Sequence, residues 1–220
     1  MNRILPQHIW DHMKALLLLL VLPIAGSGYV YLNNADRGFR ILYTQVDYAI
    51  PFVKYFAVPY LFWIVFLYIC LIYFCFRDRT MYYRMLFSYA AGVFICYMFY
   101  YFFQTTVPRP VLVGDDIFTW MVSKIYGSDQ PFNAFPSIHC FSSFLMLSGI
   151  LRSKVRNRLN TLLIGSTAML IIASTLFVKQ HVILDALSGI IVAELVFALS
   201  AYMPFGEQAL RRSRSVSHSG

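Results

Sequence analysis

The sequence predicts an all-α integral membrane protein, a bundle of six transmembrane helices with a short interfacial helix. Of its 220 residues, 59% are hydrophobic and only 13% are charged, whereas a soluble domain usually carries about 25% charged residues. The apolar residues also come in blocks of about 20, the length that crosses a bilayer as a helix. We therefore expect one membrane-embedded domain over residues 1–205 and a basic, disordered cytoplasmic tail over residues 206–220.

Six apolar blocks make up the expected bundle. The fourth block is short, and the other five are long enough to span a bilayer with modest tilt. The helices are expected near residues 15–32, 58–76, 85–103, 136–151, 160–178 and 182–203.

The interfacial helix is expected in the long connection between the third and fourth blocks, within "DDIFTWMVSKIYG". Its apolar residues recur at helical spacing, Asp115 or Asp116 can cap its start, and Gly127 can end it. Trp120 and Tyr126 suit the headgroup level of a membrane.

The basic residues predict the orientation of the bundle, because cytoplasmic loops of membrane proteins carry an excess of Lys and Arg. With the N-terminus inside, the inner segments hold twelve: Arg3, Lys14, Arg77, Arg79, Arg84, Arg152, Lys154, Arg156, Arg158, Arg211, Arg212 and Arg214. The outer segments hold six: Arg37, Arg40, Lys54, Arg109, Lys124 and Lys179. Both termini are therefore expected in the cytoplasm of a multi-pass cell-membrane protein.

Several classes of protein are disfavoured. The net charge of +8 lies between apolar blocks, which indicates membrane topology rather than nucleic-acid binding. The sequence contains no HExxH motif, acidic cluster or Gly-rich phosphate loop, so we expect neither a metal nor a cofactor. The cysteines lie within or beside apolar blocks and indicate neither a disulfide framework nor a zinc site: Cys70, Cys75, Cys96 and Cys140.

The first group of candidate site residues is "PSIH", at the start of the fourth block. Pro136 suits the first helical turn, where its missing N–H costs nothing. The amides of Ser137, Ile138 and His139 would then lack helical partners and could bind phosphate. Taken alone, the group could equally be an ordinary helix start with a packed histidine.

The second group is "KQHVILD", in which His181 and Asp185 are four residues apart. On one helical face, the carboxylate could accept a hydrogen bond from one ring nitrogen and leave the other as a nucleophile. A salt-bridged interfacial pair is the plainer alternative.

The third group is "VPRP", which holds Arg109 between two prolines. Its planar guanidinium suits bidentate binding of phosphate, although an interfacial anchor would look the same. Together, the three groups fit a metal-free phosphoryl transfer through a phosphohistidine on the outer side.

These groups resemble the motifs of the type-2 phosphatidic acid phosphatase superfamily, which includes vanadium haloperoxidases. The family has K-x6-R-P, then P-S-G-H, then S-R-x5-H-x3-D, and this order is kept over residues 102–185. Among its branches, the one containing inositol phosphorylceramide synthases and related bacterial proteins is the most similar. The matching residues are Arg109 and Pro110, then Pro136, Ser137 and His139, then Ser174, His181 and Asp185.

The chain departs from the family motifs at three positions. Phe102 stands where the first motif has lysine, Ile138 where the second has glycine, and Thr175 where the third has arginine. Lys179 could replace the missing cation, because it shares a face with Thr175 if the helix continues there.

The resemblance implies roles for these residues. His181 would attack phosphorus, Asp185 would orient it, and His139 would protonate the leaving oxygen. The implied protein is a lipid phosphatase that acts on a phosphomonoester or pyrophosphate at the extracytoplasmic face. A lipid phosphotransferase is the main alternative, and a non-catalytic transporter or scaffold the third. The implied phosphate-binding residues are Arg109, Ser137, Ile138 and Lys179.

Overall fold

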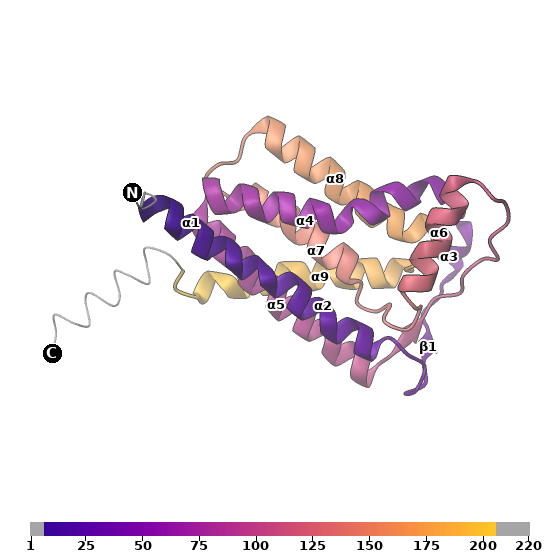
Figure 1. The fold of residues 1–220 in the computed structure, drawn as a ribbon. Coiled ribbons are helices and arrows are strands. Elements are labelled where there is room, and N and C mark those ends of the chain that lie inside the picture. Colours follow the sequence, from indigo (N-terminus) through magenta and orange to yellow (C-terminus); the bar gives the residue numbers. More distant parts are fainter. Residues whose placement is uncertain (1–6, 206–220) are drawn as a thin grey trace, which may run out of the picture.

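The computed structural model describes residues 7–205, so the expected tail over 206–220 lies outside the described residues. The long helices run roughly side by side (Figure 1). They are α1 (Gln7–Leu17), α2 (Val21–Leu32), α4 (Ala57–Arg77), α5 (Arg79–Phe102), α7 (Ile138–Arg152), α8 (Arg158–Phe177) and α9 (Ile183–Leu199). A 3₁₀ turn over Leu18–Leu20 joins α1 to α2, and others precede α4 at Lys54–Phe56 and follow α9 at Ser200–Tyr202.

Five stretches within residues 7–205 are long and apolar enough to cross a membrane, so the chain is a helical membrane protein. They are His12–Leu32, Lys54–Arg77, Arg79–Phe102, Arg158–Phe177 and Ile183–Tyr202. The sixth expected span, α7, has 15 residues, which is about 22 Å of helix against a hydrocarbon core of about 30 Å. The expected six-helix bundle is therefore confirmed by length for five helices.

Helix α7 lies at the centre of the bundle and packs against α4, α5, α8 and α9. Its aromatic side chain Phe141 fills the space beside Gly92 of α5, where a Cβ atom would come within 2.1 Å of the phenylalanine ring. Gly149 likewise admits the sulfur of Met85 at 2.6 Å from an added Cβ. These close approaches fix α7 against α5, and they explain why a short helix can be the best buried one.

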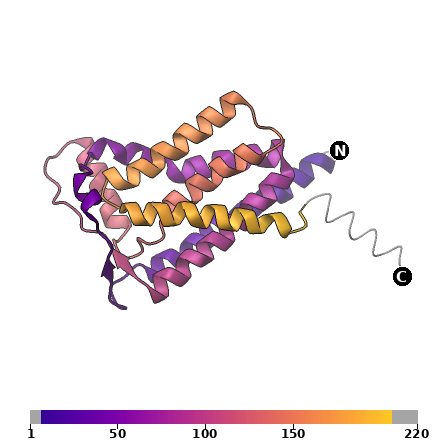
Figure 2. The same cartoon turned by 180° about the vertical axis from the view of Figure 1, so that it is seen from behind.

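The connections at one end of the bundle hold the short elements. These are α3 (Gln45–Ala49), α6 (Ile117–Ser128) and the parallel pair β1 (Arg40–Ile41) and β2 (Thr105–Thr106). Figure 1 shows α3, α6 and β1 together at the end opposite the start of α1, and Figure 2 shows α9 running between the two ends.

The expected helix after Asp116 is confirmed. Asp116 is its N-cap and accepts hydrogen bonds from the amides of Phe118 and Thr119. The helix ends at Ser128, one residue later than expected. Tyr126 does not point freely outward, because its hydroxyl donates to the carbonyl of Val178 at 2.7 Å. Helix α6 is thereby tied to the α8–α9 connection.

Candidate active site

The start of α7 is capped by a serine rather than opened by a proline. Ser137 is the N-cap, and its hydroxyl accepts a hydrogen bond from the amide of Cys140 at 3.2 Å. The expected place of Pro136 in the first helical turn is therefore wrong, because the helix begins at Ile138. The Ser137 amide is also taken, since it donates to the carbonyl of Asp185 at 3.0 Å.

Two amides remain open at this helix start. Among the described residues, the amides of Ile138 and His139 donate no hydrogen bond outside the helix, and no helical carbonyl precedes them. Both amides point out of the N-terminal end of α7, where the helix dipole favours a negative charge. Two open amides, instead of the three expected, are therefore available at this helix start.

His139 lies buried within a ring of aromatic side chains. Its imidazole stacks on Tyr60 with centroids 4.6 Å apart and packs at 4.1 Å from Trp63, both on α4. The Trp63 indole is itself held by a 2.7 Å hydrogen bond to Ser142. The imidazole of His181 lies next to that of His139, with the two ring centroids 5.6 Å apart. The structure therefore brings the two sequence-predicted histidines side by side, with their ring planes tilted by 55°.

His181 lies beside Asp185, but not on a common helical face as expected. Helix α9 begins at Ile183, so His181 belongs to the connection before it. The carboxylate caps the helix by accepting from the Val182 amide at 2.9 Å, which leaves His181 Nδ1 3.5 Å from Oδ2 of Asp185. That distance exceeds the usual 2.7–3.2 Å of a hydrogen bond.

This buried pair is also incompletely satisfied. Neither Nδ1 of His181 nor Oδ1 of Asp185 has a hydrogen-bond partner within the described part of the chain. Buried polar atoms normally find partners, because an unpaired one costs roughly 1–3 kcal/mol. A shift of a few tenths of an ångström would bring Nδ1 of His181 within hydrogen-bond distance of Oδ2 of Asp185 and orient the imidazole.

Gly189 sets the distance between the two helices that carry these groups. A Cβ atom at this position would lie 2.6 Å from the carbonyl oxygen of Ser137 and 2.9 Å from the amide of Phe141. Both of those atoms are backbone, so neither could swing away. The absence of a side chain therefore lets α9 approach the start of α7 and places His181 opposite His139.

Arg109 lies in the segment after β2 and is half-buried. Its guanidinium donates to the carbonyls of Tyr126 at 3.1 Å and Asp129 at 2.5 Å, and to the side-chain oxygen of Gln180. Burial lowers the pKa of Arg109, while the neighbouring Asp129 carboxylate opposes this shift. The side chain stays charged, because an arginine does not lose its proton in proteins. Its Nε has no partner within residues 7–205.

Lys179 does not share a helical face with Thr175. Helix α8 ends at Phe177, and the Thr175 carbonyl accepts from the amides of Gln180 and His181 instead. The Lys179 ammonium donates to the carbonyls of Asp47 at 3.1 Å and Ile50 at 2.5 Å. Burial lowers the pKa of Lys179, and the nearby Asp47 charge partly offsets this.

One central residue, Asp129, belongs to no motif of the sequence. Its carboxylate accepts from the hydroxyls of Tyr29 at 2.5 Å and Tyr60 at 2.9 Å, and from Asn33 and Gln180 at 3.1 and 3.4 Å. The partners come from widely separated segments, so no local pattern predicts the cluster. Asp129 therefore links Tyr60, which stacks on His139, to Gln180, whose side-chain oxygen accepts from Arg109.

A second residue not foreseen, Asp47, holds the start of α9. It accepts from the amide and hydroxyl of Thr44 at 2.8 and 2.6 Å and from the amide of Ile183 at 2.8 Å. Burial alone would raise the pKa of Asp47, but these hydrogen bonds outweigh it and the net pKa is lowered. The charged carboxylate therefore stabilises the helix start directly after His181.

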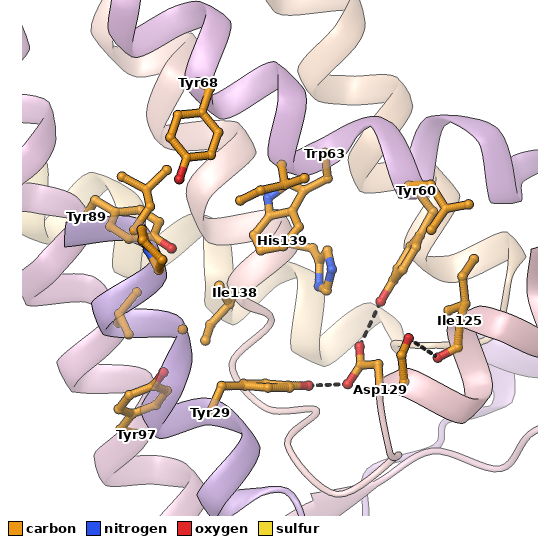
Figure 3. Close-up of a pocket in the computed structure, with 17 residues that line it drawn as sticks. Tyr29, Tyr60, Trp63, Tyr68, Tyr89, Tyr97, Ile125, Asp129, Ile138 and His139 are labelled. Carbon is orange, nitrogen blue, oxygen red and sulfur yellow. Dashed lines mark hydrogen bonds between the residues drawn. The ribbon is translucent and has the colours of Figure 1, made fainter. Parts of the chain in front are cut away.

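A cavity of about 430 Å³ borders this site and is lined by residues of α2, α4, α5, α6 and α7. Figure 3 shows the His139 ring and the Asp129 carboxylate at its wall, with Tyr29 and Tyr60 bonded to Asp129. Within residues 7–205, no group of three or more His, Cys, Asp or Glu side chains is arranged to hold a metal ion.

The comparison with known families decides what this arrangement belongs to. The model of the PAP2 superfamily matches residues 81–209, more than half of the chain. The chain belongs to the PAP2 superfamily. The matched region contains Arg109, His139, His181 and Asp185. PAP2 membership supports a membrane-embedded lipid phosphatase in general, with a lipid phosphate as its substrate.

Among solved structures, the chain is similar to the crystal structure of Aquifex aeolicus LpxE. The TM-score is 0.50 at 15% sequence identity, over 80% of this chain and 94% of that chain. At this identity, the likeness shows a shared fold. No curated protein matches the chain.

Proposed function

We propose that this PAP2 protein is a lipid phosphatase that hydrolyses a lipid phosphomonoester or pyrophosphate through a phosphohistidine. The observation that carries the proposal is the pair of adjacent, buried imidazoles. His139 and His181 lie 5.6 Å apart between ring centroids, with Asp185 3.5 Å behind His181 Nδ1. A nucleophile, a general acid and an orienting carboxylate are the groups that such a reaction needs.

In the first step, Nε2 of His181 attacks phosphorus and the bond to the lipid oxygen breaks. His139 donates its proton to that leaving oxygen, so a lipid alcohol departs. In the second step, neutral His139 takes a proton from water, whose oxygen attacks the phosphohistidine and releases phosphate. Asp185 orients His181 throughout and stabilises its positive charge once Nδ1–H approaches Oδ2.

The phosphoryl oxygens need donors that are already in place. The open amides of Ile138 and His139 meet this need, and the Ser137 hydroxyl still has its own proton to donate. Arg109 and Lys179 supply positive charge. Both now donate to backbone carbonyls, so in this proposal they exchange part of those bonds for phosphate oxygens.

The site lies on the extracytoplasmic face in this proposal, with both ends of the bundle's chain in the cytoplasm. The support is the distribution of charge: the end opposite the site carries the clustered basic residues, as cytoplasmic loops do. This cluster comprises Arg77, Arg79, Arg84, Arg152, Lys154, Arg156 and Arg158.

Phosphotransfer to a second lipid alcohol is the alternative, and the cavity favours it. The space borders His139, which would activate an alcohol in the same way as water. The two functions share the first step and differ in what attacks the phosphohistidine.

Rapid acid-free quenching of the purified protein with ³²P-labelled lipid phosphate tests the proposal. We expect a base-stable, acid-labile label on His181, and its decay should release inorganic phosphate in water or a labelled lipid when an alcohol is added. His12→Ala is the matched control, because His12 stacks on Phe76 at the far end of the bundle. No label in the wild-type protein, or equal labelling of His181→Ala, would contradict the phosphohistidine.

A further inference from the structure

The cavity beside His139 indicates what kind of lipid the proposed reaction would act on, and this inference rests on the proposed function. Its walls are mostly apolar and aromatic, with Leu22, Trp63 and Val93 among them. A volume of about 430 Å³ lies within the range of small-molecule sites. The cavity lies between membrane-spanning helices, so an apolar chain can occupy it without crossing water.

The cavity approaches the reacting groups from one side only. His139 and Asp129 line it, whereas His181, Arg109 and Lys179 do not. In the proposed reaction, His139 faces the leaving oxygen and the two cations face the phosphoryl oxygens. The cavity is therefore on the side where the alcohol part of the lipid sits.

The hydroxyl groups beside Asp129 present lone pairs rather than protons. Tyr29 donates its proton to Oδ1 of Asp129 and Tyr60 donates its proton to Oδ2. Both tyrosines line the cavity. The Tyr60 oxygen already accepts from Nε2 of Gln180 at 3.3 Å, whereas the Tyr29 oxygen accepts no hydrogen bond within residues 7–205 and can still accept one. On the wall formed by α6, the Ser128 hydroxyl donates its proton to the Lys124 carbonyl at 2.9 Å, so this proton is not available to a ligand either.

Such a wall selects the chemistry of what lies against it. A hydroxyl or amino group of the lipid would donate to the oxygen of Tyr29, whereas an ether or ester oxygen would find no donor there and stay unpaired. A second phosphate would face the Asp129 carboxylate at short range and be repelled.

We infer that this cavity binds the alcohol moiety of a singly phosphorylated lipid that carries a free hydroxyl or amino donor beside the phosphoester. Tyr29 accepts that hydrogen bond, and Asp129, which also accepts from Tyr60, holds Tyr29 in the accepting orientation. The chain of the lipid lies along α2, α4 and α5. Tyr60 also stacks on His139, so a lipid seated by its donor is aligned with the general acid.

A matched pair of lipids tests this directly: a monoacylglycerol 3-phosphate with a free 2-hydroxyl, and the same lipid as its 2-O-methyl ether. We expect the hydroxyl lipid to have a roughly 10- to 100-fold higher kcat/KM, the size of one lost hydrogen bond in a buried, charge-linked network. In Tyr29→Phe, this ratio should fall toward 1. Tyr97→Phe is the matched control, because its hydroxyl is spent on the Ala25 carbonyl and lies away from Asp129.

Binding separates this inference from the proposed reaction. His181→Ala protein in lipid nanodiscs cannot complete turnover, so the affinities of both lipids can be measured at equilibrium through Trp63 fluorescence. The hydroxyl lipid should bind more tightly by a similar factor, and a lipid with a second phosphate should bind more weakly. Equal affinities for the hydroxyl and the methyl ether would overturn the inference and reduce the cavity to a non-specific lipid crevice. Preferential binding without any phosphate release would retain the inference and remove the reaction.

Discussion

The two ends of the bundle both bury a carboxylate, and they treat it differently. At the basic end, Asp78 caps α5 through the Met81 amide at 3.2 Å and accepts from the Ser153 hydroxyl at 2.7 Å and the Lys154 amide at 3.1 Å. At the other end, Asp185 caps α9 with one oxygen and leaves its second oxygen unpaired beside His181.

The difference separates a carboxylate whose contacts are all structural from one for which we propose a role in the reaction. Asp78 ties the α4–α5 turn to the α7–α8 connection, and its donors come from both. Asp185 also ties backbone segments together, because its carboxylate accepts from the Val182 amide and its carbonyl accepts from the Ser137 amide. Its second oxygen is buried without a hydrogen bond, which destabilises the fold. Such an unpaired group is typical of a site arranged for a ligand or a reaction.

The sharpest contrast is expected for His181→Ala. Removing the nucleophile should lower kcat for phosphate release by roughly 10⁴-fold or more, while the melting temperature in detergent changes little. Phosphate release from a lipid phosphate and thermal unfolding, measured on the same preparation, check both parts. Turnover within tenfold of wild type would place the nucleophile elsewhere and make the pair with Asp185 structural, as at the basic end.

The next largest effect is expected for His139→Ala. Losing one general acid should lower kcat by about 10²–10⁴-fold, because the leaving alkoxide then departs without a proton. A substrate with a more acidic leaving alcohol should recover much of the loss, which a structural defect would not allow. If activated and ordinary substrates lose rate equally, His139 does not act as the acid.

A smaller effect is expected for Lys179→Ala. An ammonium that binds phosphate should contribute about 2–4 kcal/mol of transition-state stabilisation, as one preorganised donor does, and Lys179→Arg should retain much of it. Lys54→Ala, which removes a lysine paired with Asp116 on the same end, is the control. Unchanged kcat/KM with a lower melting temperature would mean that Lys179 serves only the carbonyls of Asp47 and Ile50.

The smallest effect on catalysis is expected at the basic end. Asp78→Ala should leave kcat per folded molecule within about twofold and lower stability by about 1–3 kcal/mol, because buried donors lose their acceptor. A double-mutant cycle with Ser153→Ala measures their coupling, and Asp115→Ala, at an exposed carboxylate, controls for the loss of charge. A large loss of kcat in Asp78→Ala would show that the two ends are coupled.

The sequence predicts the parts of the site whose residues are close together or follow a motif. The pairs Ser137–His139 and His181–Asp185 need only short spacings, and the structure brings both to one place. The cap of α6 at Asp116 follows for the same reason. Each of these depends on a few consecutive residues and the geometry of a single helix end.

The sequence does not predict what depends on distant partners. Asp129 is bonded to residues up to 100 positions away, and Asp47 caps a helix that begins 136 residues later. The end of α8 at Phe177 lies within one residue of the expected end. The helix does not continue to Lys179, because the Thr175 carbonyl accepts from the amides of Gln180 and His181 instead, so the condition for a shared face with Thr175 is not met.

The two histidines and most of the cavity wall come from different helices, which has a consequence for engineering and for evolutionary change. The two imidazoles of the proposed reaction lie in α7 and directly before α9, whereas most of the cavity wall is supplied by α2, α4 and α5. Wall residues such as Leu22 and Val93 can therefore be exchanged without touching the close packing at Gly189. A library of variants with substitutions only in α2, α4 and α5 would change the preference for the length and polarity of the lipid chain, while the reaction itself stays the same.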